Sequence, residues 1–259
     1  MPVSAGLYYQ VHNQAATLPV VLIHGAGGHH LHWPAEIRRL PGMRVFALDL
    51  PGHGNSLGAG QQSVQAYAEA VADWQQGVSL QRAVFVGHSM GGAIALWLAL
   101  AHPENVLALG LLGASRRLRV NPDLIESLSD AEKFLGVVKQ IVRWSYSCRA
   151  PESLMAVAYR RLAKTRPSVL YGDFVACDSF DVGGRLEELH CPVLLLCGEE
   201  DKMVPARSVR QLAEILPQAR LEIIPEAGHM VMLEKPQRVA AILLEFLNGI
   251  QIQKSATTF

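Results

Sequence analysis

Short, continuously apolar segments alternate along this chain with longer segments of helical periodicity. We expect strands at residues 20–24, 44–48, 83–87, 106–112, 193–197 and 221–224. We expect helices at residues 63–78, 91–101, 208–216 and 236–248. A strand that is apolar on both faces has to be covered on both faces, which is typical of a parallel sheet between two layers of helices. The alternation therefore predicts an α/β fold, to which residues 6–12 add one or two antiparallel strands at one edge.

The alternation fails between residues 115 and 188, where the sequence is helical in character and has no continuously apolar strand. Arginines and aromatic residues are frequent in this stretch. Because open α/β sheets bind their ligands beyond the carboxyl ends of the strands, several helices inserted there would cover a ligand site. We therefore expect a core formed by residues 1–114 and 189–259, and a helical cap formed by residues 115–188.

Charge and apolar content exclude several classes of function. Lys and Arg together number 23, as do Asp and Glu, so the formal net charge is zero. A general nucleic-acid-binding surface would need an excess of positive charge. The chain does not open with a basic segment followed by an apolar one, and its longest apolar run, residues 91–101, is too short for a membrane span of about 20 residues. We expect a cytoplasmic monomer or homodimer that binds neither nucleic acid nor membrane.

Neither the cysteines nor the histidines indicate a metal site. The four cysteines form no C-x-x-C pair, which would be the signature of a zinc or redox site. His29, His30 and His32 do not have the H-x-x-x-H spacing of two metal ligands on one helix face. No cysteine or carboxylate accompanies them before Glu36. We expect no bound metal and four reduced thiols.

The motif with the most chemical information is Gly-His-Ser-Met-Gly at residues 87–91, between a predicted strand and a predicted helix. A serine on so sharp a turn has strained backbone dihedrals, and side chains two residues before or after it would collide. Gly87 and Gly91 remove that collision. The start of the helix adds positive potential and free N–H groups, among them that of Met90, where an oxyanion would form. The motif predicts that Ser89 is a nucleophile.

A serine hydroxyl needs a neighbouring base, and the base needs an acid that fixes its tautomer. His229 lies between the last predicted strand and the last predicted helix, so its loop can lean over Ser89. Asp201 follows the preceding strand and completes the chain order Ser, Asp, His that belongs to this motif. Glu199 and Glu200 are rival acids on the same loop. We expect Ser89, Asp201 and His229 to form a catalytic triad.

A glycine-rich turn, His-Gly-Ala-Gly-Gly at residues 24–28, follows the first parallel strand. We expect the backbone N–H groups of Ala26 and Met90 to converge and form an oxyanion hole. A Gly-x-Gly after a strand is also the start of a dinucleotide-binding turn. The third glycine of that fingerprint would fall at His30 and is absent, which disfavours a dinucleotide-dependent oxidoreductase.

Together these segments resemble the α/β-hydrolase superfamily. The matching residues are 24–27, 49–56, 87–91, 198–205 and 228–229, and the resemblance spans about residues 19–250. It implies a mostly parallel eight-stranded sheet, a Ser-His-Asp triad, no cofactor, and hydrolysis of a carboxylic ester or a related acyl bond. Residues 49–56 look structural in that family. The serine at position 89 separates this chain from members with a carboxylate there, such as haloalkane dehalogenases and epoxide hydrolases.

The remaining expectations concern the substrate. We expect Gly25, Gly27, Trp33, His88 and Met230 to contact it, with Trp33 as a wall of the acyl site. The apolar cap and the small oxyanion loop favour an ester with a small to medium, largely apolar acyl group. The triad alone does not separate ester hydrolysis from lactone, thioester or carbon–carbon bond hydrolysis, or from cofactor-free perhydrolysis. A small-molecule binding or signalling protein that keeps the hydrolase fold is the alternative of another class.

Overall fold

In the computed structural model, which describes residues 2–216 and 218–256, eight strands form one sheet. Their order is β1-β2-β4-β3-β5-β6-β7-β8, in which the pairs β1·β2 and β2·β4 are antiparallel and every other pair of neighbours is parallel. The strands are β1 (Val3–Ser4), β2 (Leu7–His12), β3 (Leu18–Ile23), β4 (Met43–Leu48), β5 (Ala83–His88), β6 (Val106–Leu112), β7 (Val193–Gly198) and β8 (Arg220–Ile224). The prediction of a mostly parallel eight-stranded sheet with an antiparallel edge is confirmed.

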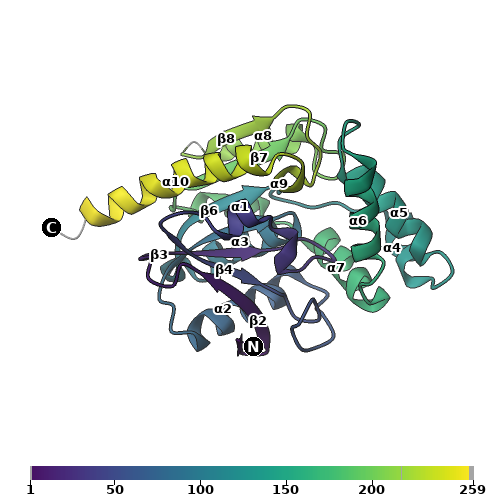
Figure 1. Ribbon diagram of the computed structural model, residues 1–259, viewed down its shortest axis with the longest axis horizontal. Coiled ribbons are helices and arrows are strands. Elements are labelled where there is room, and N and C mark those ends of the chain that lie inside the picture. Colours follow the sequence, from purple (N-terminus) through teal and green to yellow (C-terminus); the bar gives the residue numbers. More distant parts are fainter. Residues whose placement is uncertain (1, 217, 257–259) are drawn as a thin grey trace.

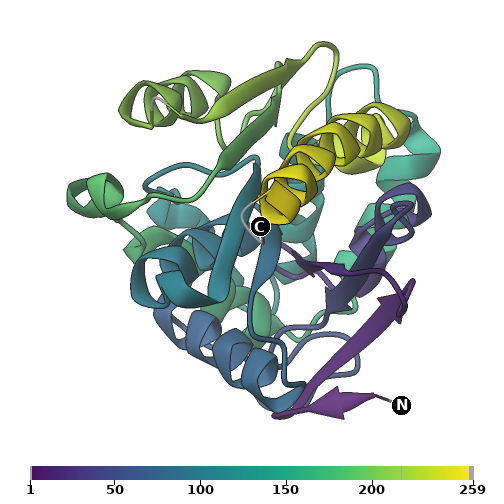
Figure 2. The same ribbon diagram turned by 90° about the vertical axis from the view of Figure 1, so that its left-hand side faces the viewer.

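Helices cover the sheet from both sides, which is why its central strands are apolar on both faces. On β5, Phe85 packs toward α2, α3 and α8, whereas Val84 and Val86 pack toward α1, α9 and α10. Figures 1 and 2 show α10 on the opposite side of the sheet from α2 and α3. The helices are α1 (Ala35–Arg38), α2 (Val64–Gly77), α3 (Met90–Ala101), α8 (Ala206–Ile215), α9 (Val231–Glu234) and α10 (Pro236–Ala256).

Four further helices lie between β6 and β7 and are called the cap helices below. They are α4 (Pro122–Ser129), α5 (Phe134–Ser145), α6 (Glu152–Leu162) and α7 (Pro167–Ser179). They lie together beyond one end of the sheet, on the right in Figure 1. They enclose an apolar cluster of their own, which includes Leu128, Val138 and Leu170. A 3-10 helix, η3 (Gly183–Glu188), returns the chain to β7.

The shortest elements left no signal in the sequence. α1, α9, η1 (His30–His32) and η2 (Pro103–Asn105) have only three or four residues each, fewer than the window in which helical periodicity can be recognised. α10 continues to Ala256, past its predicted end at residue 248. Within residues 2–216 and 218–256, we find no helix with both the length and the apolar character of a membrane span. As expected, the four cysteines are free.

Candidate active site

Ser89 occupies the turn between β5 and α3 in a backbone conformation that side chains rarely adopt, with φ 53° and ψ −117°. The turn is possible because the residues that flank it have no side chain. A Cβ at Gly87 would lie 2.1 Å from the carbonyl oxygen of Gly91, and a Cβ at Gly91 would lie 2.2 Å from that of Ile23. Gly87 is therefore required by the turn itself and Gly91 by the close approach of β3. The turn presents Ser89 to the cavity at the end of the sheet.

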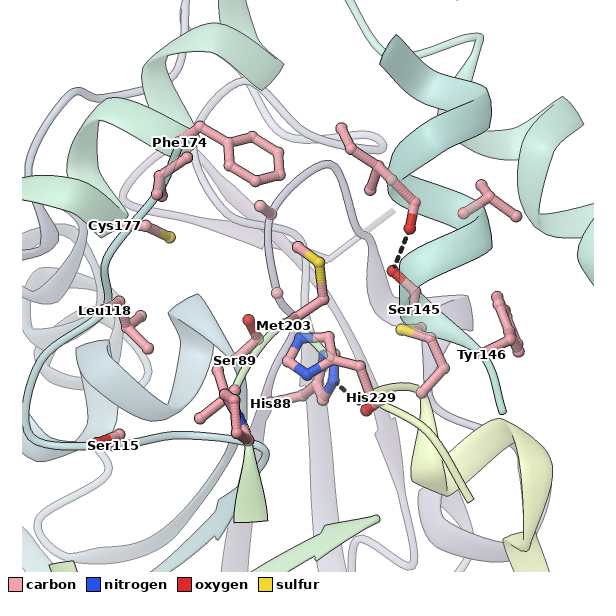
Figure 3. Close-up of a pocket in the computed structure, with 18 of the residues that line it drawn as sticks. His88, Ser89, Ser115, Leu118, Ser145, Tyr146, Phe174, Cys177, Met203 and His229 are labelled. Atoms are coloured by element: carbon pink, nitrogen blue, oxygen red, sulfur yellow. Dashed lines mark hydrogen bonds between the residues drawn. The ribbon is translucent and has the colours of Figure 1, made fainter. Parts of the chain in front are cut away.

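His229 and Asp201 are joined by a hydrogen bond at the same end of the sheet. Nδ1 of His229 lies 2.8 Å from Oδ2 of Asp201, and both side chains are buried. The other carboxylate oxygen, Oδ1, accepts hydrogen bonds of 2.8 Å from the N–H groups of Met203 and Val204. An Nδ1–H donated to Asp201 leaves Nε2 of His229 free to accept a proton. Ser89 and His229 line one cavity (Figure 3).

The two rival acids of the same loop lie elsewhere. Glu199 is exposed, and Glu200 accepts a hydrogen bond of 2.9 Å from the N–H of Cys148. Among the residues that the structure describes, Asp201 is the carboxylate bonded to His229. Position 201 differs from its neighbours because its second oxygen is held by the backbone of the turn that follows.

Two backbone N–H groups near Ser89, those of Ala26 and Met90, make no hydrogen bond within the described part of the chain. Ala26 lines the cavity, in a turn closed by a 3.0 Å hydrogen bond from the N–H of Gly28 to the carbonyl oxygen of Gly25. Met90 is the first residue of α3, where the N–H groups have no partner within the helix and the helix dipole is positive. Both groups are available to a negatively charged oxygen bound at Ser89.

A cavity of about 520 Å³ lies between this end of the sheet and the cap helices. In Figure 3, Ser89 and His229 lie at one side of it and Phe174 at the other. The side chains that α5, α6 and α7 contribute are mostly apolar, including Ile141, Val142, Leu154, Val157, Leu162 and Phe174. Five arginines also line the cavity, namely Arg116, Arg117, Arg119, Arg161 and Arg207. No aspartate or glutamate of the described residues does so.

The comparison with protein families agrees with this geometry. A family model described as the alpha/beta hydrolase family matches residues 20–242, which include Ser89, Asp201 and His229. This chain belongs to the alpha/beta hydrolase family. The structure and the family match therefore both show the fold that the resemblance implied.

Relatives and structural neighbours of the hydrolase include esterases. The hydrolase is 30% identical to a pimeloyl-[acyl-carrier protein] methyl ester esterase of Neisseria meningitidis, over 94% of this chain and 81% of that protein. It is also 30% identical to a putative 2-succinyl-6-hydroxy-2,4-cyclohexadiene-1-carboxylate synthase of Bacillus subtilis, over 96% and 97% of the two chains. Among solved structures, a thermophilic esterase of Thermogutta terrifontis is similar, with a TM-score of 0.83 and 25% identity over 94% and 93%. The protein is thus an enzyme of the hydrolase class with esterases among its relatives.

Three of the five residues expected to contact substrate line the cavity, namely Gly25, His88 and Met230. Trp33 does not line it, because its side chain is fully buried in the apolar layer that packs against α1 and α10. Trp33 therefore cannot form a wall of the acyl site. It directly follows the short helix η1, and so brief a turn has no periodicity from which its buried side could be predicted.

Gly27 also lies outside the residues that line the cavity. A Cβ at this position would lie 2.4 Å from Cδ1 of Leu162 and 2.8 Å from Cδ1 of Leu170, both on the cap helices. The side of Gly27 from which a side chain would project is therefore filled by the cap helices.

His88 contacts the candidate base. Its Nε2 lies 2.9 Å from the carbonyl oxygen of His229, to which Nε2–H donates, and the two rings lie 4.6 Å apart. Burial, together with the nearby His229, holds the pKa of His88 well below its ordinary value. His88 is therefore neutral at pH 7 and helps to fix the loop that carries His229.

Acidification is expected to destabilise the wild-type protein more than a His88→Gln variant, whose amide can still donate to His229. The pKa of His88 is depressed in the folded state, so its contribution to stability is present above the unfolded pKa of about 6.5 and lost as the pH falls. Between pH 7.5 and 5.5 the wild-type free energy of unfolding should fall by about 1.4 kcal/mol more than that of the variant. Urea unfolding at both pH values measures this difference. Equal losses would show that His88 binds a proton in the folded protein.

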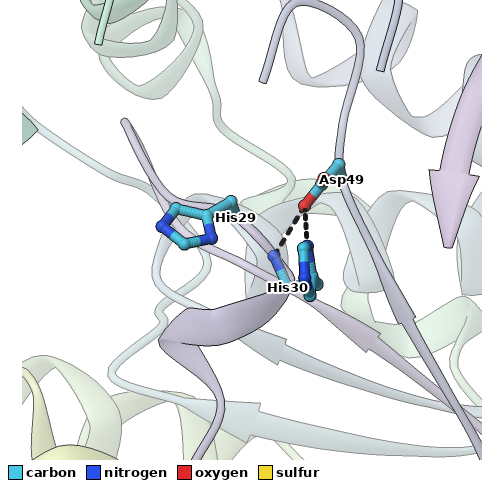
Figure 4. Close-up of side chains that lie close together, drawn as sticks. All are labelled: His29, His30 and Asp49. Carbon is cyan, nitrogen blue, oxygen red and sulfur yellow. Dashed lines mark hydrogen bonds and ion pairs between the residues drawn. The ribbon is translucent and has the colours of Figure 1, made fainter. Parts of the chain in front are cut away.

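His29, His30 and Asp49 present possible metal-ligand atoms within 4.8 Å of one another. Figure 4 shows how the three side chains lie. The Asp49 carboxylate is already occupied by hydrogen bonds. Oδ1 lies 2.8 Å from Nδ1 of His30 and accepts its backbone N–H at 2.7 Å, while Oδ2 accepts the N–H of Asn55 at 2.8 Å. These bonds join the loops after β3 and β4, which fits the structural role that the resemblance implied for residues 49–56.

Sequence patterns did not reveal the residues that hold the His229 loop. The N–H of Gly228 donates to Oε1 of Glu234 at 2.8 Å, and the N–H of Met230 donates to the carbonyl oxygen of Ser145 on α5 at 2.9 Å. The candidate base is therefore held partly by a cap helix. Contacts between segments so far apart in the chain leave no local pattern by which they could be found.

Proposed function

We propose that the hydrolase is a serine esterase that cleaves a carboxylic ester through an acyl-enzyme on Ser89. The observation that carries this proposal is the 2.8 Å hydrogen bond between His229 and Asp201 beside the cavity that Ser89 also lines. The strained turn at Ser89 and the esterases among the relatives support it further.

In this mechanism the Ser89 hydroxyl attacks the ester carbonyl carbon while Nε2 of His229 takes its proton. Asp201 holds the imidazole in the required tautomer and stabilises its positive charge. The N–H groups of Ala26 and Met90 bind the oxyanion of the tetrahedral intermediate. The alcohol leaves with the proton from His229, and a water molecule, activated by the same imidazole, then hydrolyses the acyl-enzyme.

The lining of the cavity favours an apolar acyl chain with a negatively charged group at its far end. Apolar side chains of the cap helices surround the space beside Ser89. Arg119, Arg161 and Arg207 come from three separate segments, and none forms an ion pair with a carboxylate in the described part of the chain. These three arginines are exposed, and no acidic residue of that part lines the cavity. We therefore infer a positive potential that attracts anions, weakened by the surrounding solvent. We therefore extend the expectation of a largely apolar acyl group to the half-ester of a dicarboxylic acid.

A matched pair of methyl esters tests both parts of the proposal. Methyl hexanoate and monomethyl adipate have the same chain length and differ in the terminal carboxylate. We expect hydrolysis of both, with kcat/KM about tenfold higher for the half-ester at low salt, an advantage that shrinks as salt screens the arginines. Arg161→Gln should reduce the advantage without lowering kcat/KM for methyl hexanoate.

The outcomes separate the two parts. Equal kcat/KM values for the two esters at all salt concentrations would support the esterase function but contradict the preference for a negatively charged substrate. Turnover of neither ester by the wild-type protein, with turnover of a lactone or thioester of similar size, would replace ester hydrolysis by one of those related reactions.

A further inference from the structure

Asp173, on the cap helix α7, is a fully buried carboxylate whose hydrogen-bond partners all lie outside the cap helices. Its Oδ2 accepts the backbone N–H of Gly27 at 2.7 Å and lies 2.8 Å from Nε2 of His53. Its Oδ1 accepts the hydroxyl of Tyr67 at 2.6 Å. A carboxylate without such partners would be very unfavourable in the interior. These bonds therefore tie α7 to the turn after β3, the turn after β4 and helix α2.

His53 supplies the positive charge that compensates the buried carboxylate. Its Nδ1 lies 3.0 Å from the carbonyl oxygen of Pro51, and its Nε2 faces Asp173. Because both ring nitrogens face acceptors, both carry a proton. Burial by itself lowers the pKa of His53, but the charge and hydrogen bond of Asp173 outweigh burial and raise the pKa. Asp173 and His53 form an ion pair inside the protein, away from the substrate cavity.

The cap also holds Gly27 through its other atoms. Its carbonyl oxygen accepts a 3.3 Å hydrogen bond from the hydroxyl of Thr165, in the segment between α6 and α7. Leu162 occupies the space beside its Cα. Both polar backbone groups of Gly27 are thus bound by the cap, and Gly27 is the neighbour of Ala26, whose N–H is free.

We propose that Asp173 is a positioning residue, which holds the turn at residues 25–28 so that the Ala26 N–H points at the oxyanion formed on Ser89. The proposal rests on the esterase function proposed above. Three of the four residues of this turn are glycines, so the free turn has many backbone conformations. An oxyanion-hole donor is effective only when it is already aimed at the position where the charge develops. The cap helix and the oxyanion hole are therefore coupled through one carboxylate.

The variant Asp173→Ala removes the acceptor of the Gly27 N–H. We expect kcat to fall about 100-fold with little change in KM, because the loss of one oxyanion donor has an effect of this size. The kcat is expressed per Ser89 that reacts with a fluorophosphonate, so that inactive protein is not counted. The affinity for phenylboronic acid, whose tetrahedral adduct places an oxygen in the oxyanion hole, should fall by the same factor. Asp173→Asn keeps an amide oxygen for Gly27 and should retain activity within about fivefold of wild type.

Asp178→Ala is the matched control on the same helix. Oδ1 of Asp178 accepts the N–H of Val120 at 3.0 Å, in the loop after β6 and not in the turn at residues 25–28. This variant loosens the cap without releasing Gly27, so kcat per reactive Ser89 should stay near the wild-type value. If Asp173→Ala does not fold, Asp173→Ser carries the same test, because its hydroxyl is too short to reach Gly27 but can still bind water.

Several results would overturn the proposal. These are an unchanged kcat per reactive Ser89 in Asp173→Ala or Asp173→Ser, an equal loss in Asp178→Ala, or a loss of kcat with unchanged boronic acid affinity. If neither Asp173→Ala nor Asp173→Ser folds, the proposal also fails, because Asp173 would then be needed for folding and not specifically for positioning the turn. If the wild-type protein hydrolyses no ester, the esterase function fails, but the ratio of boronic acid affinities still decides the role of Asp173.

Discussion

Replacing Ser89 by alanine is expected to abolish ester hydrolysis while the protein stays folded. The hydroxyl is the atom that would bond to the acyl group, so no other residue can replace it, and kcat should fall by about 10⁶-fold. The Cβ and the backbone remain, and the two glycines still permit the turn, so the melting temperature should change by no more than about 2 °C. Hydrolysis of monomethyl adipate and a thermal melt measure the two effects.

Ser115→Ala is the matched control for this variant. Ser115 is a second serine that lines the cavity, and it should be dispensable. A fluorophosphonate should label the wild-type protein once, at Ser89, and should not label Ser89→Ala. Equal turnover by Ser89→Ala and the wild-type protein would show that Ser89 is not the nucleophile. If the wild-type protein bound the esters but neither hydrolysed them nor reacted with the fluorophosphonate, it would instead be a small-molecule binding protein that keeps the hydrolase fold.

Asp201→Asn should slow hydrolysis by about 10⁴-fold, because the substitution inverts the tautomer of His229. Oδ1 of Asp201 accepts two backbone N–H groups, so the amide oxygen of asparagine has to occupy that position. The amide nitrogen then replaces Oδ2 and donates to Nδ1 of His229. The imidazole proton moves to Nε2, which can no longer take the proton of Ser89. The kcat of the variant, measured at constant pH, reports this loss.

Glu200→Gln is the control for the acid. Glu200 lies one residue before Asp201 and binds the N–H of Cys148, not His229, so this variant should keep nearly full activity. If Glu200→Gln lost more activity than Asp201→Asn, the acid would be misassigned, whatever the geometry of the resting enzyme.

The fold was predictable from the sequence because its signals are local. Continuous apolar runs indicated strands buried on both faces, and the expected ends of each parallel strand lie within two residues of those observed. The motif at Ser89 is equally local in the sequence, and Gly87 is needed by the backbone of nearby Gly91, whereas Gly91 is needed by the end of β3. The short helices were missed, and with them the burial of Trp33.

Residues that act through distant partners could not be predicted in the same way. Asp201 was preferred to Glu199 and Glu200 from the sequence, but the hydrogen bond that distinguishes it is made to His229, 28 residues further on. Asp173 gave no signal at all, because its partner Gly27 is 146 residues away. Arg119, Arg161 and Arg207 line one space although they lie far apart in the chain, so no local pattern could show that they meet.

The amino-acid sequence alone therefore determined the layers of the fold, the turn at Ser89 and the segments that could meet there. The tertiary structure decided which carboxylate reaches His229, which side chains line the cavity, and how a cap helix holds the turn beside the oxyanion site. The physical reason is that backbone strain and periodic burial involve neighbouring residues, whereas hydrogen bonds between loops depend on where the folded sheet brings their ends together.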